Sequence, residues 1–483
     1  MMRILQVSLC FVTMLFAGLT AAREPFEYRL QYPNSGADLV TVEMHVPGIP
    51  AGPQVLVIPR AIPMGYTQEP YDRFVRNVSA WSPTGESLSV VRADGPQWVV
   101  GAEAQTISRI RYDVDIAAME EEILDSSDAS KRRSGYLSLL GYSVFAYLDG
   151  LKNRPVHLRI EVPADWPVTT TLAPRVPAHV GKTTADAEDF YALADSQIIA
   201  GPDATIYRLN GKVPLYLALY AEGEVDVPLL ASLTEETMAA VVDYFGFAPF
   251  PHFTVVQELL RPISSRHNYN YSMEHLLSAT FYLSEDRGIT AQTDRSEIER
   301  ARFNYAHHFA HAWIPKRLSG EGYRPFNWEL APVIDTIWFS EGFAQYLAMA
   351  ALAERLPDDE KKAYLADLVQ QRFRDNLDDA PSFSKKMSLV ELSRSASTLS
   401  SHDFRTLRNI SSRGGMMAAE MDALIRQKSG GTKTLREGLR FLMRWSEREH
   451  RPLDMAELPT LLEQAVGVNT APILRQWTKP PAN

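Results

Sequence analysis

Three histidines lie close together in the segment HHFAHAW, residues 307–313. His307 and His311 are four residues apart, and in an α-helix this spacing places both imidazoles on one face. Two imidazoles so placed can bind a single metal ion, although a solvated or hydrogen-bonded histidine pair is the competing interpretation. His308 follows the first histidine, at the position where a zinc hydrolase with the H-E-x-x-H motif carries its general-base glutamate.

Glu341 is a candidate for a third ligand. It lies near the start of a second predicted helix, in the segment DTIWFSEGFAQYLA, residues 335–348. Three protein ligands with one open position are typical of a catalytic rather than a structural zinc site. The helix dipole alone also favours an acidic residue in a first turn, which is the simpler reading of Glu341. Together the spacing predicts a Zn²⁺ site on His307, His311 and Glu341.

The element that carries the histidines is predicted to be an enclosed helix. Ser296 and Glu299 have the spacing of a capping box that begins a helix, and Pro315 helps to end it. Tyr305 and Phe309 share an apolar face, and the histidines point roughly the opposite way. A helix with apolar groups on one side and histidines on the other is expected to form the wall of a cavity.

The second half of the chain, residues 206–478, is predicted to be mainly helical. Further capping boxes are expected to begin helices at Ser232 with Glu235 and at Thr434 with Glu437. The first of these helices should end at Gly246, because glycine is a common helix stop. A few strands, such as the one over 253–259, are expected among the helices.

Residues 23–205 have the pattern of a β domain. Apolar residues alternate with polar ones over 110–116 and over 156–162. Strict alternation indicates strands with one buried and one solvated face, as in a β-sandwich. We therefore expect an α+β multidomain protein, with an N-terminal β-sandwich-like domain followed by a mainly helical one.

The first 22 residues have the features of a signal peptide: an early Arg3, an apolar run, and small side chains at Thr20 and Ala22. We expect cleavage after Ala22 and export to the periplasm or the extracellular space. A membrane anchor is the alternative, but the apolar run is short, and no later stretch is apolar enough to span a bilayer. Cys10 is the single cysteine, so the mature chain would have no disulfide.

The net charge of −10 argues against a nucleic-acid partner, which normally requires a basic face.

Two sequence blocks resemble the glycyl aminopeptidase family of zinc metallopeptidases. The family pattern H-E-x-x-H-x-W-x-x-K-R is matched, apart from its glutamate, by HHFAHAWIPKR, and the pattern W-x-x-E-G-x-x-x-Y by WFSEGFAQY. Weaker similarity to other family segments lies at 58–66 with Trp98, 244–250, 272–275 and 413–426. The resemblance implies a gluzincin (thermolysin-like) domain and the zinc ligands His307, His311 and Glu341. It also implies that peptide or protein N-termini are the partners, with Glu274 and Tyr271 near the substrate's amino end.

The chain departs from the family pattern at several positions. His308 replaces the catalytic glutamate, and Ile410 and Ser411 stand where the tyrosine that stabilises the tetrahedral intermediate is expected. Ser272 replaces the second glycine of the glycine-rich edge. The chain stops at Asn483, about where the family's PDZ domain would begin, so we expect no PDZ domain.

These departures leave two functions open. Loss of a general base costs about 10²–10⁴ in rate, and loss of an oxyanion donor about 10²–10³. The first function is a peptide-binding pseudoenzyme that keeps the scaffold and the metal. The second is an active zinc aminopeptidase that releases small N-terminal residues and uses His308 as an unusual base. A third arrangement would make His308 an additional metal ligand, although it projects about 100° away around the helix.

Overall fold

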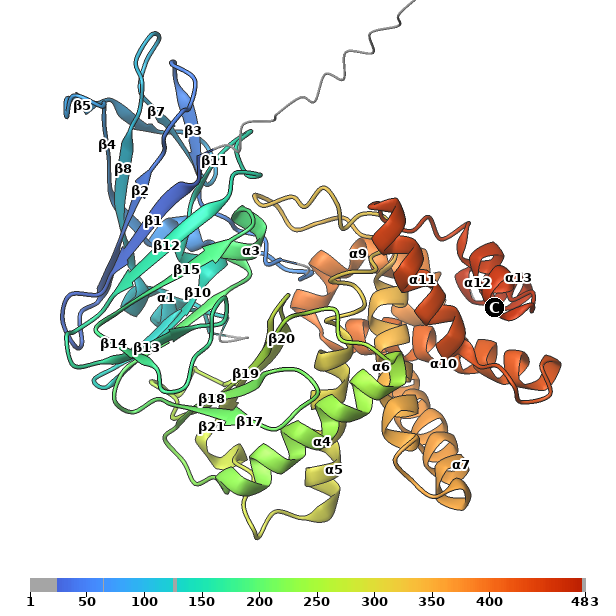
Figure 1. Ribbon diagram of the computed structural model, residues 1–483. Helices are drawn as coiled ribbons and strands as arrows, with labels where there is room; N and C mark the ends of the chain where they lie inside the picture. The colour runs from blue at the N-terminus through green and yellow to red at the C-terminus, as the bar shows by residue number, and fades with distance from the viewer. Residues whose placement is uncertain (1–23, 64, 125–127, 480–483) are drawn as a thin grey trace, which may run out of the picture.

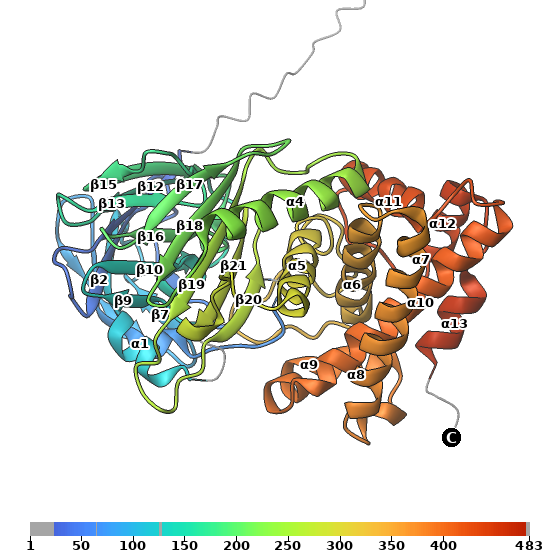
Figure 2. The same ribbon diagram turned by 90° about the horizontal axis from the view of Figure 1, so that it is seen from below.

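The computed structural model describes residues 24–63, 65–124 and 128–479, and Figure 1 shows their arrangement. The expected signal peptide, residues 1–22, and its cleavage site therefore lie outside the described residues. The N-terminal part consists of β-sheets and the C-terminal part mainly of helices, as the sequence predicts. A further sheet lies between the two parts (Figure 2).

The largest sheet of the N-terminal part has seven strands in the order β15-β12-β1-β2-β8-β4-β5. Its strands are β1 (Phe26–Gln31), β2 (Leu39–His45), β4 (Val75–Trp81), β5 (Ser87–Leu88), β8 (Arg109–Asp115), β12 (Val156–Glu161) and β15 (Lys182–Ala187). Strands β8 and β12 are the two that the alternating pattern predicts. In both, the apolar side chains are buried on one face and the polar ones face outward.

Two smaller sheets complete the N-terminal part. One has the order β14-β13-β16-β10-β9 and the other the order β11-β3-β7-β6. Their strands are β3 (Gln54–Val57), β6 (Val90–Arg92), β7 (Gln97–Val100), β9 (Lys131–Arg133), β10 (Tyr136–Leu140), β11 (Tyr147–Leu148), β13 (Pro167–Thr170), β14 (His179–Val180) and β16 (Gln197–Ala200). The short helices are η1 (Tyr71–Phe74), α1 (Ile116–Glu122), α2 (Gly141–Val144) and α3 (Phe190–Ala194). One apolar core joins the three sheets.

The intervening sheet has the order β17-β18-β19-β21-β20. Its strands are β17 (Thr205–Leu209), β18 (Leu215–Ala221), β19 (Phe253–Leu260), β20 (Asn270–Glu274) and β21 (Ser278–Ser284). Val255 on β19 packs into the core of the helical part, whereas its neighbour Val256 packs into the N-terminal core. Because both faces are covered, all eight residues of β19 are buried, as is typical of parallel strands with apolar sequences.

The helices follow this sheet. They are α4 (Val227–Phe245), η2 (Glu285–Arg287), α5 (Arg295–Ala310), α6 (Ile337–Ala353), α7 (Asp358–Asp367), η3 (Leu368–Phe373), α8 (Arg374–Asp379), η4 (Ser384–Lys386), α9 (Leu389–His402), α10 (Arg405–Lys428), α11 (Leu435–Glu449), α12 (Leu458–Val466) and α13 (Ala471–Thr478). Helices α6 and α10 approach closely at Gly342 and Gly414. A Cβ on Gly342 would lie 2.4 Å from the Gly414 backbone, so only glycine permits this packing.

Two predicted helix starts are wrong. Helix α4 begins at Val227 with Asp226 as its cap, and Ser232 instead bonds Glu236 one turn further along the same helix. Helix α5 begins at Arg295, after Asp294, without the predicted capping box. The stop at Gly246 and the capping box of Thr434 with Glu437 are confirmed.

Over the described residues, the structure contains no helix with the length and hydropathy needed to cross a membrane.

Candidate metal centre

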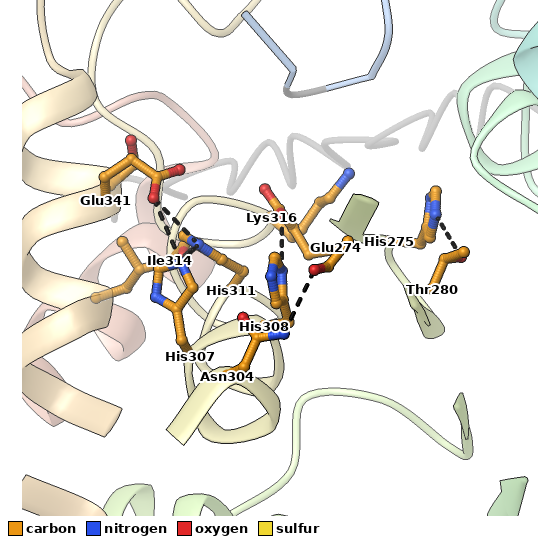
Figure 3. A network of polar contacts seen from close by, with 12 residues as sticks. Glu274, His275, Thr280, Asn304, His307, His308, His311, Ile314, Lys316 and Glu341 are labelled. Atoms are coloured by element: carbon orange, nitrogen blue, oxygen red, sulfur yellow. Dashed lines mark hydrogen bonds and ion pairs between the residues drawn. The ribbon is translucent and has the colours of Figure 1, made fainter. Parts of the chain in front are cut away.

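The last turn of α5 and the first turns of α6 bring three candidate ligands together in a buried cluster. The Nε2 atoms of His307 and His311 are 3.1 Å apart. The Oε2 atom of Glu341 is 3.4 Å from Nε2 of His307 and 3.6 Å from Nε2 of His311. Figure 3 shows both imidazoles turned toward the carboxylate. The three residues can thus offer donor atoms that all lie within 4.8 Å of one another.

Two hydrogen bonds fix the orientation of these side chains. The Nδ1 atom of His311 is 2.8 Å from the carbonyl oxygen of Ile314, so Nδ1 is placed to donate and Nε2 is turned toward the other two candidate ligands. The hydroxyl of Tyr66 donates to Oε1 of Glu341 at 2.7 Å, which leaves Oε2 facing the histidines. Tyr66 comes from a loop of the N-terminal part and also lies 3.2 Å from the hydroxyl of Tyr323.

Burial and mutual charge set the protonation of the cluster. Burial and the neighbouring His311 lower the pKa of His307 to about 4. Burial also disfavours the cationic form of His311, but the carboxylates of Glu274 and Glu341 outweigh it and raise the pKa of His311 to about 9. Burial opposes ionisation of Glu341, yet His311 and His307 hold its pKa well below the ordinary value. At neutral pH Glu341 is therefore ionised and His307 neutral, so both can bind a metal cation directly, whereas His311 must first lose a proton.

The residues present fit a zinc ion. Two imidazole nitrogens and one carboxylate are a ligand set that zinc takes, and they leave one coordination position open. His311 and Glu341 each form a hydrogen bond that fixes the orientation of the side chain, as is usual for metal ligands. All three ligands line a cleft of about 2260 Å³ between the helices and the intervening sheet. The open position would therefore be reachable by a peptide.

His308 does not join the three candidate ligands. Its Nδ1 atom lies 3.5 Å from Oε2 of Glu274 on β20, and its ring meets the edge of Phe281 with centroids 5.4 Å apart. Figure 3 shows this pair side by side, turned away from Glu341. Burial raises the pKa of Glu274, but His311 and His308 outweigh that effect and lower it to about 2. Glu274 is thus an anion that faces His308.

The remaining predicted positions also lie at the cleft. Tyr271 and Glu274 both line it, beside the histidines. Ser411 lines it from α10, and its hydroxyl donates to the carbonyl of Leu407 at 2.9 Å, within the same helix. Ile410 is fully buried. Positions 410 and 411 therefore offer no phenol to the cleft.

A buried ionic network holds the metal helix and the β20–β21 turn in place. The Nζ atom of Lys316 donates to Asp195 at 3.1 Å, and Nδ1 of His275 lies 3.0 Å from the same carboxylate. The backbone N–H of Leu276 donates to the other oxygen of Asp195 at 2.6 Å. All three side chains are fully or almost fully buried. Asp195 of the N-terminal part therefore holds two segments in place: the turn that follows Glu274 and the segment that follows α5.

Sequence reasoning missed the roles of Tyr66 and Asp195. Tyr66 lies 275 residues from Glu341, and Asp195 lies 80 residues from His275 and 121 from Lys316. Neither belongs to a motif with a chemical meaning of its own. The guanidinium of Arg317 donates to the carbonyl of Ala312 at 2.7 Å, just after the end of α5. Lys316 instead bonds across to the N-terminal part.

Comparison with known families matches two regions of the chain. Residues 27–202 match the peptidase M61 N-terminal domain, and residues 302–407 match the M61 glycyl aminopeptidase domain. The second region contains the candidate ligands. Among curated proteins, none matches the chain.

Solved structures share the fold. An aminopeptidase N family protein from Idiomarina loihiensis superposes with a TM-score of 0.81 at 19% identity, over 95% of this chain and 76% of that one. An M1 zinc metallopeptidase mutant from Deinococcus radiodurans, bound to a Tyr-Ser-Ala substrate, superposes with a TM-score of 0.57 at 18% identity. That match covers 94% of each chain. At these identities the likeness is one of fold.

Proposed function

Because this chain belongs to the M61 glycyl aminopeptidase family, we propose that it is an exported peptide-binding protein that holds Zn²⁺ but hydrolyses peptides slowly or not at all. The observation that carries the proposal is the contrast around α5. His307, His311 and Glu341 converge as a ligand set, whereas His308 faces Glu274 and stands where the family has a glutamate.

The chemistry that zinc supplies in such sites is a lowered pKa of bound water and polarisation of the substrate carbonyl. The chain must then accept a proton and stabilise the developing oxyanion. The side chain at the general-base position is His308, whose Nδ1 faces Glu274. No phenol stands at positions 410 and 411. On the magnitudes for general-base and oxyanion losses, turnover falls by about 10²–10⁴ from the first loss and about 10²–10³ from the second.

Peptide binding needs fewer groups than hydrolysis. The carboxylate of Glu274 is anionic and lies in the cleft near the histidines, where it is placed to hold the ammonium group of a peptide N-terminus. Tyr271 on the same strand lines the cleft beside it. The structurally similar metallopeptidase from Deinococcus radiodurans was solved with a bound tripeptide. We therefore expect short peptides with a free N-terminus to be the ligands.

The second candidate function is an active zinc aminopeptidase. One observation favours it: the carboxylate of Glu274 lies 3.5 Å from Nδ1 of His308, and a carboxylate beside an imidazole is the arrangement that orients a histidine base. In that case the rate should depend on both residues. Glu274→Gln and His308→Ala would each then abolish a chelator-sensitive activity.

Metal analysis tests the first part of the proposal. Protein purified without chelator should contain about one zinc per chain, and a variant with Glu341→Gln should contain much less. A wild-type protein that folds normally and takes up no zinc would contradict the proposal.

Export is tested separately by fractionation of the producing cells. The mature protein should be found outside the cytoplasm and should begin at Arg23. A full-length protein that keeps residues 1–22 and stays in the cytoplasm would contradict this part.

A further inference from the structure

An arginine without an acidic partner lies in the cleft, close to the metal centre. Arg372 belongs to η3, a π-helical turn between α7 and α8, and π-turns are frequent at functional sites. Its guanidinium carbon lies 3.9 Å from the ring centroid of Phe303. The Phe303 ring is stacked on the His307 ring, with centroids 6.4 Å apart and planes 7° apart. The two distances together place the guanidinium within about 10 Å of a candidate zinc ligand.

The hydrogen-bonding capacity of Arg372 is unused. Within the part of the chain that the structure describes, its guanidinium forms no ion pair and donates no hydrogen bond. Other arginines nearby are paired: Arg302 on α5 binds Glu236 at 2.7 Å, and Arg408 on α10 lies 3.4 Å from Asp379. A guanidinium carries five N–H donors in a fork that matches a carboxylate. Those of Arg372 are free to bind a ligand.

Arg372 has a cationic neighbour, Arg300, while the acidic Glu299 lies near Tyr364. Burial lowers the pKa of Arg372 to about 10, Tyr364 opposes that effect, and the neighbouring cation Arg300 adds to it. Arg372 remains protonated at neutral pH, and a second positive charge lies close to it. Asp367 and Asp375 also line the cleft, but neither forms an ion pair with Arg372. A bound anion would offset the cost of burying the Arg372 charge and the repulsion between Arg372 and Arg300.

We infer that Arg372, with Arg300 and the hydroxyl of Tyr364, forms a carboxylate-binding subsite for the C-terminal end of a short peptide. All three residues line the same cleft as the metal centre. The inference rests on the proposed function, because it assigns the other end of the same bound peptide.

The spacing defines the length of the ligand. An extended peptide advances about 3.3–3.6 Å per residue, so a guanidinium at most about 10 Å from the His307 ring lies within about three residues of the metal centre. Phe303 and His307 share one face of α5, whereas His308, which contacts Glu274, lies about 100° around the helix. Glu274 and Arg372 therefore bound the metal centre from two different sides. A tripeptide or tetrapeptide with free ends would reach both charges.

The subsite is tested by calorimetric binding of three probes to the zinc-loaded full chain: trialanine, trialanine amide, and Ala-Ala-Asp amide. Trialanine should bind about 10- to 100-fold more tightly than its amide, the range expected for charge-assisted hydrogen bonds. Ala-Ala-Asp amide separates an α-carboxylate from a side-chain carboxylate. If it binds as tightly as trialanine, the subsite accepts any carboxylate, and the preference for a C-terminus is wrong.

The Arg372→Gln variant should lose the preference for the acid and keep the affinity for the amide unchanged. Arg372→Lys keeps the charge and should lie between the two. Arg29→Gln is the matched control, because it removes the same charge from a paired arginine of the N-terminal sheet that does not line the cleft. Equal affinities of wild-type protein for acid and amide, unchanged in Arg372→Gln, would overturn the inference and leave peptide binding intact. Binding of none of the three peptides would instead refute the proposed function, and the subsite with it.

Discussion

The two sides of helix α5 differ in what they retain. On one side His307, His311 and Glu341 converge, and Tyr66 and the Ile314 carbonyl fix their orientation. On the other side His308 faces Glu274. At the place of the expected tyrosine, Ser411 of α10 lines the cleft. The first side has every group needed to hold a metal. The second carries His308 and Ser411 at the positions where the family pattern has a glutamate and a tyrosine.

The proposed function assigns metal binding and turnover to separate residues around the cleft. A set of metal ligands stays in place when the hydrogen bonds to the ligands are kept, because those bonds hold the donor atoms in position. Catalysis depends on single side chains of a particular length and basicity, and one substitution removes them. The predictions below test whether the two sides are in fact independent.

The largest effect is expected when the second side is restored. The double variant His308→Glu with Ser411→Tyr should raise the turnover of an alanine anilide by about 10⁴–10⁷ over wild type, since it returns a base worth about 10²–10⁴ and an oxyanion donor worth about 10²–10³. Initial rates with and without a chelator measure this. Each single variant serves as a control and should gain less. A double variant with unchanged turnover and normal zinc content would show that the cleft differs from the family in further ways.

The next largest effect is expected at the first side. Structural zinc sites bind with about 10–16 kcal/mol, so one of three protein ligands carries on the order of 4 kcal/mol. His311→Ala should therefore weaken zinc binding by about 10³-fold, as measured by competition with a chelating dye. His157→Ala, at an exposed histidine of the N-terminal sheet, is the matched control and should bind zinc normally. Equal affinity in the two variants would mean that zinc is held elsewhere.

A smaller effect is expected from the tyrosine hydroxyl that orients one of the candidate ligands. Tyr66→Phe removes the hydroxyl that orients Glu341 and should weaken zinc binding by about 10- to 100-fold. Tyr28→Phe removes another buried hydroxyl, one that donates to the carbonyl of Ala146 in the N-terminal part. That variant should keep the wild-type affinity. If both substitutions lower zinc affinity equally, the effect of Tyr66 is one of general stability.

The smallest effect, taken per pH unit, is the pH dependence of zinc binding. In the metal-free site the pKa of His311 is about 9, while that of His307 is about 4, so only His311 must lose a proton on binding. Zinc affinity should rise about tenfold per pH unit from pH 7 to 9 and flatten above. Calorimetry at pH 7.5 in two buffers of different ionisation enthalpy should show release of about one proton. Release of none would contradict this protonation of His311.

The parts of the fold that the sequence predicts are those determined by local pattern. Strands β8 and β12 follow from alternation, and the capping box of Thr434 follows from the spacing of two side chains. The start of α4 does not follow, because Asp226 supplies an equally good cap earlier in the chain and Pro228 suits the first turn. Where two caps compete, the residues alone do not decide between them.

The candidate site divides in the same way. The metal triad is predictable because His307 and His311 have a spacing with a chemical meaning and Glu341 completes a known ligand set. Tyr66 is not, since it reaches Glu341 from 275 residues away through a loop of the N-terminal part. Arg372 is equally hidden in the sequence, because its distinguishing property is the lack of a partner, which depends on how α5 and η3 pack.

The most direct test of the central claim is the hydrolysis rate of an alanine anilide by the zinc-loaded wild-type chain, compared before and after chelation. The account predicts that zinc is bound and that chelation changes the rate little, because the groups needed for turnover are missing. Chelator-sensitive hydrolysis at about 1–10³ s⁻¹, the range of ordinary enzymes, would contradict it and establish His308 as a working base.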